Sequence, residues 1–86
     1  MDFIEFIQTK ILLHRKKYSD GEVLDLMTKC WDYASELDNM HDTSVHLNRV
    51  KKFMDIHNHK SNNTQIHYLT ILYKYFSYRL KLDSQR

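Results

Sequence analysis

The clearest structural signal in the sequence is residues 18–23, which read Tyr18-Ser19-Asp20-Gly21-Glu22-Val23. A serine followed three residues later by a glutamate forms a capping box. In this motif the Ser19 hydroxyl accepts a hydrogen bond from a backbone amide of the new helix, and the Glu22 side chain accepts one from the Ser19 amide. Tyr18 and Val23 flank the cap as a hydrophobic staple. The stretch therefore predicts that a helix begins near residue 20.

An apolar stripe with helical spacing follows this cap. Its members are Val23, Leu26, Met27, Cys30, Ala34 and Leu37. On a helical wheel, Asp25, Asp32 and Glu36 fall on the opposite side. The pattern predicts an amphipathic helix over about 20–38 with an acidic outer face.

Three further helices are expected on the same grounds. One covers about 3–16, where apolar residues recur at helical spacing behind Asp2. Another covers about 44–58, after a polar break in which Asp42 or Thr43 supplies the cap. The last covers about 64–81, after a second polar break. Residues 1–86 are thus predicted to form a single all-α domain, a small bundle of about four helices.

Composition narrows the class of protein. The 86 residues include one glycine, no proline and one cysteine. Tight hairpins and glycine-rich phosphate loops need glycine, so sandwiches, barrels and dinucleotide-binding folds are disfavoured. One cysteine forms no internal disulfide, the N-terminus carries no basic signal region, and no apolar run reaches the roughly 18 residues of a membrane span. These features predict a cytoplasmic protein that does not enter the membrane.

The predicted last helix has two apolar faces. The first consists of Ile66, Leu69, Tyr73, Phe76 and Leu80. The second, here called the tyrosine stripe, consists of Tyr68, Ile71, Tyr75, Tyr78 and Leu82. A helix that is apolar nearly all round is buried in a bundle or in a partner, and so short a chain has little material to surround it. We interpret the tyrosine stripe as a protein interface, because tyrosine is enriched at binding hot spots, with core packing as the alternative.

Charge is distributed unevenly along the chain. Residues 20–42 contain seven acids and one lysine, whereas residues 43–81 contain seven bases and one aspartate. Six of these bases are candidate nucleic-acid contacts, because cations neutralise phosphates and the neighbouring tyrosines stack on bases: Arg49, Lys51, Lys52, Lys60, Lys74 and Lys81. The sequence pI of about 8.7 is below the value typical of a strongly basic domain, and the acidic helix would repel DNA on its own side.

Catalytic and metal chemistry find little support in the residue pattern. There are six histidines, at positions 14, 41, 46, 57, 59 and 67, and no two of them have the i,i+4 spacing of a helical metal pair. Cys30 lies on the apolar stripe, where a free cysteine behaves as a small buried hydrophobe. The sequence therefore predicts no metal, no cofactor, no small-molecule substrate and no enzymatic activity.

One local resemblance concerns residues 34–38, which read Ala34-Ser35-Glu36-Leu37-Asp38. This string resembles the serine-glutamine-glutamate-leucine-aspartate motif of the small two-helix sporulation phosphatases, which act on response-regulator aspartates. It covers five residues, and Ala34 and Ser35 depart from the motif. The string also lies several residues farther from the first predicted helix than the family motif does. The resemblance implies a response-regulator partner and a critical role for Asp38, and no site residue is taken from it.

Together these patterns predict a small non-enzymatic regulatory or adaptor protein of bacterial or phage type. It would act through protein–protein interaction, with a homodimer as the simplest form because symmetric dimers are the commonest oligomers. A nucleic-acid-binding regulator that uses the basic 49–81 region is the alternative.

Overall fold

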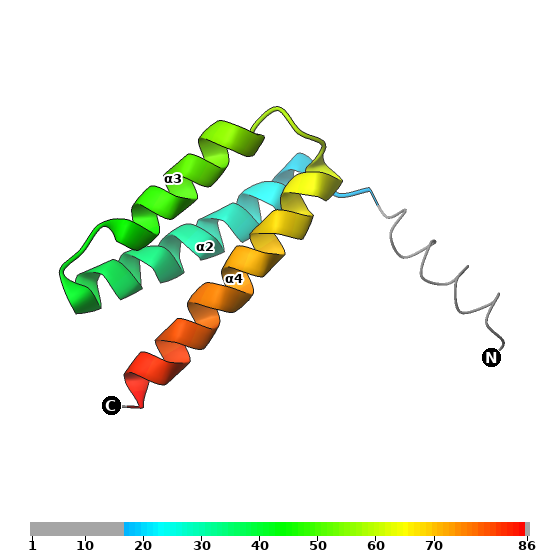
Figure 1. The fold of residues 1–86 in the computed structure, drawn as a ribbon. Helices are drawn as coiled ribbons and strands as arrows, with labels where there is room; N and C mark the ends of the chain where they lie inside the picture. Colours follow the sequence, from blue (N-terminus) through cyan, green and yellow to red (C-terminus); the bar gives the residue numbers. More distant parts are fainter. Residues whose placement is uncertain (1–16, 86) are drawn as a thin grey trace, which may run out of the picture.

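A computed structural model describes residues 17–85 of the chain, and the predicted helix over 3–16 lies outside them. Within 17–85 the chain forms three helices and no strand: α2 (Asp20–His41), α3 (Val45–His57) and α4 (Asn62–Ser84) (Figure 1). The all-α prediction is confirmed for this part of the chain. The three helices correspond in order to those expected over 20–38, 44–58 and 64–81.

Serine hydroxyls cap the first turns of α2 and α4. The Ser19 Oγ accepts a hydrogen bond from the amide of Glu22 at 3.2 Å, which confirms Ser19 as the predicted N-cap of α2. The Ser61 Oγ accepts the amide of Thr64 at 3.3 Å, so α4 begins at Asn62, two residues before the expected start. Both caps satisfy amides that have no partner within the helix.

The ends of the helices differ from the predicted ones. Helix α2 continues to His41, and Asp42 closes it in the left-handed conformation with φ 49°. Asp42 is therefore the C-cap of α2 and does not cap α3. The Thr43 hydroxyl accepts the Val45 amide at 3.2 Å, a minor part of the α3 cap. At the same end of the bundle, α4 continues to Ser84, three residues beyond the expected 81.

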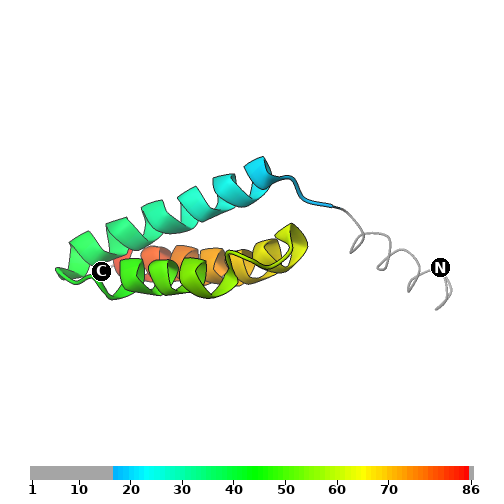
Figure 2. The same cartoon turned by 90° about the horizontal axis from the view of Figure 1, so that it is seen from above.

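The bundle has two layers, with α2 in one and both α3 and α4 in the other (Figure 2). Most contacts between helices join α2 to α4 or α2 to α3. Helices α2 and α4 run parallel and are linked near both ends. The Tyr18 amide donates to Asn63 Oδ1 at 3.1 Å, and His41 Nε2 lies 2.7 Å from Asp83 Oδ2. Helix α3 runs antiparallel to both.

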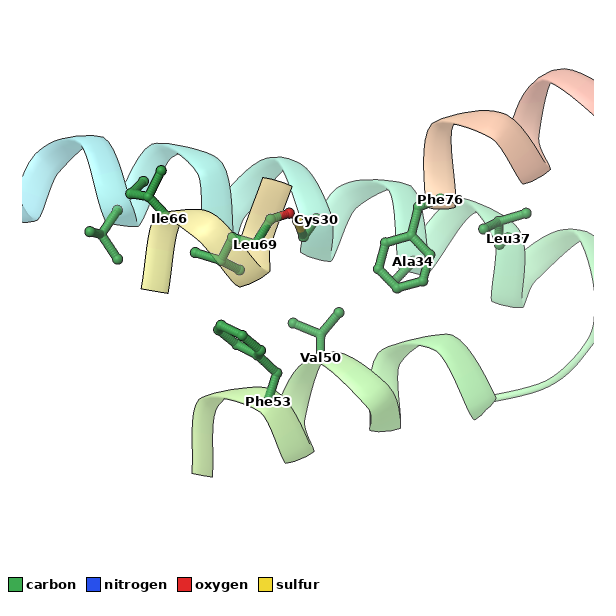
Figure 3. Packing of buried hydrophobic residues seen from close by; sticks show 9 residues of the cluster. Cys30, Ala34, Leu37, Val50, Phe53, Ile66, Leu69 and Phe76 are labelled. Carbon is green, nitrogen blue, oxygen red and sulfur yellow. Dashed lines mark hydrogen bonds between the residues drawn. The ribbon is translucent and has the colours of Figure 1, made fainter. Parts of the chain in front are cut away.

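The core lies where all three helices converge (Figure 3). Its buried members are Val23, Cys30, Ala34, Leu37, Val50, Phe53, Ile66, Leu69 and Phe76. Those from α2 belong to the apolar stripe that follows the Ser19 cap, and those from α4 belong to the first of its two apolar faces. The apolar periodicity thus correctly predicted which sides of these two helices face the core, as expected for amphipathic helices in a small bundle.

Candidate functional site

The tyrosine stripe of α4 lies on the surface of the bundle. The exposed fractions are 40% for Tyr68, 55% for Ile71, 40% for Tyr75, 61% for Tyr78 and 37% for Leu82. The opposite face of α4 carries Leu69 and Phe76, which are fully buried against α2 and α3. Helices α2 and α3 cover only that opposite face of α4. The stripe is therefore not part of the core formed by residues 17–85. Its role as a protein interface stays a prediction.

An open groove between α3 and α4 borders the stripe, and we call it the α3–α4 groove. It is lined by Arg49, Lys52, Phe53, Ile56, Tyr68, Ile71 and Leu72, and its volume is about 280 Å³. The groove exists because the backbones of α3 and α4 each lie close to α2 but approach each other at few positions. Because the groove is open to solvent and its lining is mainly apolar, it suits the side chains of a macromolecule better than an enclosed ligand.

Aromatic rings pack together where α3 ends, and two of them, Phe53 and Tyr68, line the groove. The His57 ring lies between two others, with centroids 4.6 Å from Phe53 and 4.8 Å from Tyr68. Burial lowers the pKa of His57, and the nearby charges of Lys60 and His59 lower it further. The imidazole is therefore neutral near pH 7, and this neutral ring joins α3 to α4 by stacking.

Three of the six bases predicted as nucleic-acid contacts lie beside the groove. Arg49 and Lys52 line it. The Arg49 guanidinium carbon lies 5.4 Å from the centre of the Tyr75 ring, and Lys60 Nζ lies 5.7 Å from the centre of the Tyr68 ring. Both distances are within the range of a cation–π interaction. The structure thus joins part of the basic set to the tyrosine stripe.

The other three bases lie elsewhere. Lys51 Nζ is 5.8 Å from the centre of the Trp31 ring, on the side of α3 that meets α2. Lys74 lines a second groove, about 340 Å³, formed by α4 and Tyr18. Lys81 is exposed near the end of α4. The six predicted nucleic-acid residues therefore do not form one continuous basic surface.

Opposite charge occupies the outer side of α2. Asp25, Asp32 and Glu36 are all exposed there, as the helical wheel predicts. The described bundle thus has an acidic face on α2 and a basic, aromatic face on α3 and α4. Such an asymmetric field orients approaching molecules by the sign of their charge.

Asp38 has a role that the sequence did not reveal. Its side chain is 3% exposed, and its carboxylate accepts the amides of His46 at 3.0 Å and Leu47 at 2.8 Å. His46 Nδ1 lies 2.8 Å from the same carboxylate. Burial alone would raise the pKa of Asp38, but the two amides and the His46 ring outweigh it and hold the pKa below its usual value. Asp38 thus caps α3 from within α2 and does not present a carboxylate to a response regulator.

Cys30 lies in the core, where its sequence position predicts it. It is fully buried, and its Sγ is 3.5 Å from the Leu69 carbonyl oxygen, to which the thiol donates. Burial raises the pKa of the thiol to about 11. The thiol is therefore protonated at neutral pH, and a protonated thiol is a poor nucleophile.

Residues 17–85 contain neither a metal-binding cluster nor a helix that could span a membrane. Within residues 17–85, no three histidine, cysteine, aspartate or glutamate side chains gather as a metal ion would require. None of the three described helices combines the length and the apolar character needed to cross a bilayer.

Comparisons with protein-family models, with curated proteins and with solved structures each found no match to this chain.

Proposed function

We propose that this protein is a small non-enzymatic regulator or adaptor that binds another protein through the tyrosine stripe and the α3–α4 groove. The exposure of five large side chains along one side of α4 carries this proposal. Contiguous apolar patches are uncommon on monomeric proteins and mark interaction surfaces. Tyrosine adds contact area at a low cost in side-chain entropy, and its hydroxyl tolerates water in the unbound state.

Nucleic acid is a weaker candidate for the same face. The proximity of Arg49, Lys52 and Lys60 to tyrosine rings favours it, because such a surface binds phosphates and stacks on bases. The floor of the groove is apolar, however, and the remaining predicted cations lie elsewhere. An apolar side chain of a protein partner is stabilised by burial against such a floor, whereas a phosphate backbone is not.

The test compares two double variants that each remove exposed apolar side chains. Tyr75→Ala with Tyr78→Ala alters the stripe, and Leu24→Ala with Val45→Ala alters surfaces of α2 and α3 that are 63% and 57% exposed. Tagged forms are used to capture proteins from an extract of the source cells, and quantitative mass spectrometry compares the captured sets. We expect the stripe variant to lose its main captured protein by about tenfold or more, and the control to keep it.

Circular dichroism and solution mass complete this test. Both variants should keep the helicity of the parent, and unfolding of the stripe variant would show that the stripe is structural. Light scattering reports whether the partner is a second copy, since the chain mass is 10.5 kDa. A doubled mass that the stripe variant abolishes would identify a homodimer. Equal capture by the two variants, with no change in mass, would overturn the proposal.

A further inference from the structure

We infer that the partner of the α3–α4 groove is an amphipathic helix whose apolar face is flanked by carboxylates. This inference rests on the proposed function and names the class of its partner. It follows from three properties of the groove: its shape, the charge of its rim, and the charge that a second copy would place against it.

The shape of the groove favours a helical segment. Its walls are two antiparallel helices, and its floor is formed by Phe53 and Ile56 of α3 with Ile71 and Leu72 of α4. Grooves of this kind bind amphipathic helices, which insert apolar anchors spaced by three or four residues. A helix placed there would cover the side of α3 and α4 that α2 leaves open. Ile71 and Ile56, which are 55% and 46% exposed, would be its central contacts.

The charge of the rim favours an acidic partner. Arg49 and Lys52 are the charged residues that line the groove, and Lys60 lies over the ring of Tyr68, another lining residue. Within residues 17–85, none of these three cations has a carboxylate within ion-pair distance. Carboxylates beside the apolar anchors of a partner would therefore meet cations without breaking an internal ion pair. Such complementarity speeds association and sets the orientation of the bound helix.

The same charges disfavour a second copy of this chain. A two-fold dimer places the same patch of both copies face to face, so Arg49 and Lys52 of each copy would meet like charges. The acidic face of α2 from a second copy would be complementary in charge to the cationic rim of the groove. That contact is heterologous. Repeating it generates either a closed ring or an open chain with an unused face at each end. A separate acidic helix satisfies the groove without this consequence.

Designed peptides test the inference on the full chain. One helical peptide of about 18 residues, or about 27 Å, carries leucines on one face and glutamates on both flanks. A second peptide has lysine in place of every glutamate, and a third keeps the glutamates but has glutamine in place of leucine. Fluorescence anisotropy at about 50 mM salt measures binding, because screening at higher salt weakens rim charges.

Two charge-reversal variants of equal net charge locate the binding. Arg49→Glu with Lys52→Glu reverses the rim, and Lys51→Glu with Lys74→Glu reverses two cations outside the groove. We expect the glutamate–leucine peptide to bind the parent and the control variant, and to bind the rim variant at least about tenfold more weakly. The lysine–leucine peptide should show the reverse preference. All forms must match the parent in circular dichroism.

Each alternative result would overturn the inference. These results are equal binding of the glutamate and lysine peptides, equal losses in both variants, full binding of the leucine-free peptide, or no binding up to about 1 mM. A labelled oligonucleotide that binds the parent more tightly than the peptide, with a steep salt dependence lost in the rim variant, would identify nucleic acid instead. Failure of the peptides with continued tyrosine-dependent capture would leave the proposed function intact, whereas loss of both would end it.

Discussion

The carboxylate of Asp38, near the end of α2, accepts the amide of Leu47 in the first turn of α3 at 2.8 Å. The same side chain accepts the His46 amide, so one buried aspartate satisfies two amides that α3 cannot satisfy itself. It thereby sets where α3 starts relative to α2. Because α3 forms one wall of the α3–α4 groove, the candidate site depends on a contact made outside it.

Replacing Asp38 with asparagine tests this role. The amide side chain keeps the size of the carboxylate but has one acceptor oxygen, and its NH2 group faces backbone donors. We expect Asp38→Asn to lower the free energy of unfolding by about 1–3 kcal/mol, the usual cost of a lost buried hydrogen bond. Urea denaturation measures the change, with the exposed Asp32→Asn as control. Equal, small effects of the two substitutions would show that Asp38 does not hold α3.

Stability should fall as the solution is acidified. The pKa of Asp38 is lowered in the folded protein, so its contribution is present above the unfolded value of about 3.9 and is lost as pH falls through the folded value. The pKa of His57 is also lowered, so the unfolded chain takes up its proton first and stability declines below about 6.5.

Urea midpoints measured from pH 8 to pH 3 check this dependence. We expect a plateau above about pH 7, a first decline below about 6.5 and a second below about 4. In His57→Gln the first decline should be reduced, whereas the exposed His67→Gln, which removes none of the charges that lower the His57 pKa, should follow the parent. A midpoint that rises on acidification would contradict the assignment of both groups.

The two faces of α4 should respond differently to truncation. Phe76 is fully buried and Tyr78 is 61% exposed, although both are large aromatic residues. Phe76→Ala should destabilise the fold by about 3–5 kcal/mol through a lost transfer term and a cavity. Tyr78→Ala should change stability by about 0.5 kcal/mol or less, as at other exposed positions. Similar losses at both positions would place the stripe in a core.

Gly21 offers a stabilising substitution. It lies in the first turn of α2 with no positive φ, and an added Cβ would meet its nearest neighbour, Ser19 Oγ, at an ordinary 3.8 Å. Gly21→Ala should therefore raise the free energy of unfolding by about 0.5–1 kcal/mol, because alanine loses less backbone freedom on folding. A lower melting temperature would mean that the first turn needs glycine for another reason.

The features predicted from the sequence are those encoded within one or two turns of a helix. Ser19 and Glu22 are three residues apart, and the buried stripes of α2 and α4 follow from apolar spacing. The end of α2 could not be predicted in this way. Asp38 is a turn-forming residue by composition, yet its bonds run forward to His46 and Leu47 and let α2 continue to His41. The meeting of the stripe with Arg49 and Lys60 likewise depends on how α3 and α4 pack.

A photoreactive benzophenone amino acid in place of Ile71 would show whether a protein partner covers the exposed face of α3 and α4. Ile71 is 55% exposed and belongs to both the stripe and the groove, and Leu24, which is 63% exposed on α2, is the matched control position. After irradiation of the source cells, we expect a cross-linked protein adduct from position 71 and none from position 24. Equal adducts at the two positions, or none at position 71, would contradict a partner-binding face on α3 and α4.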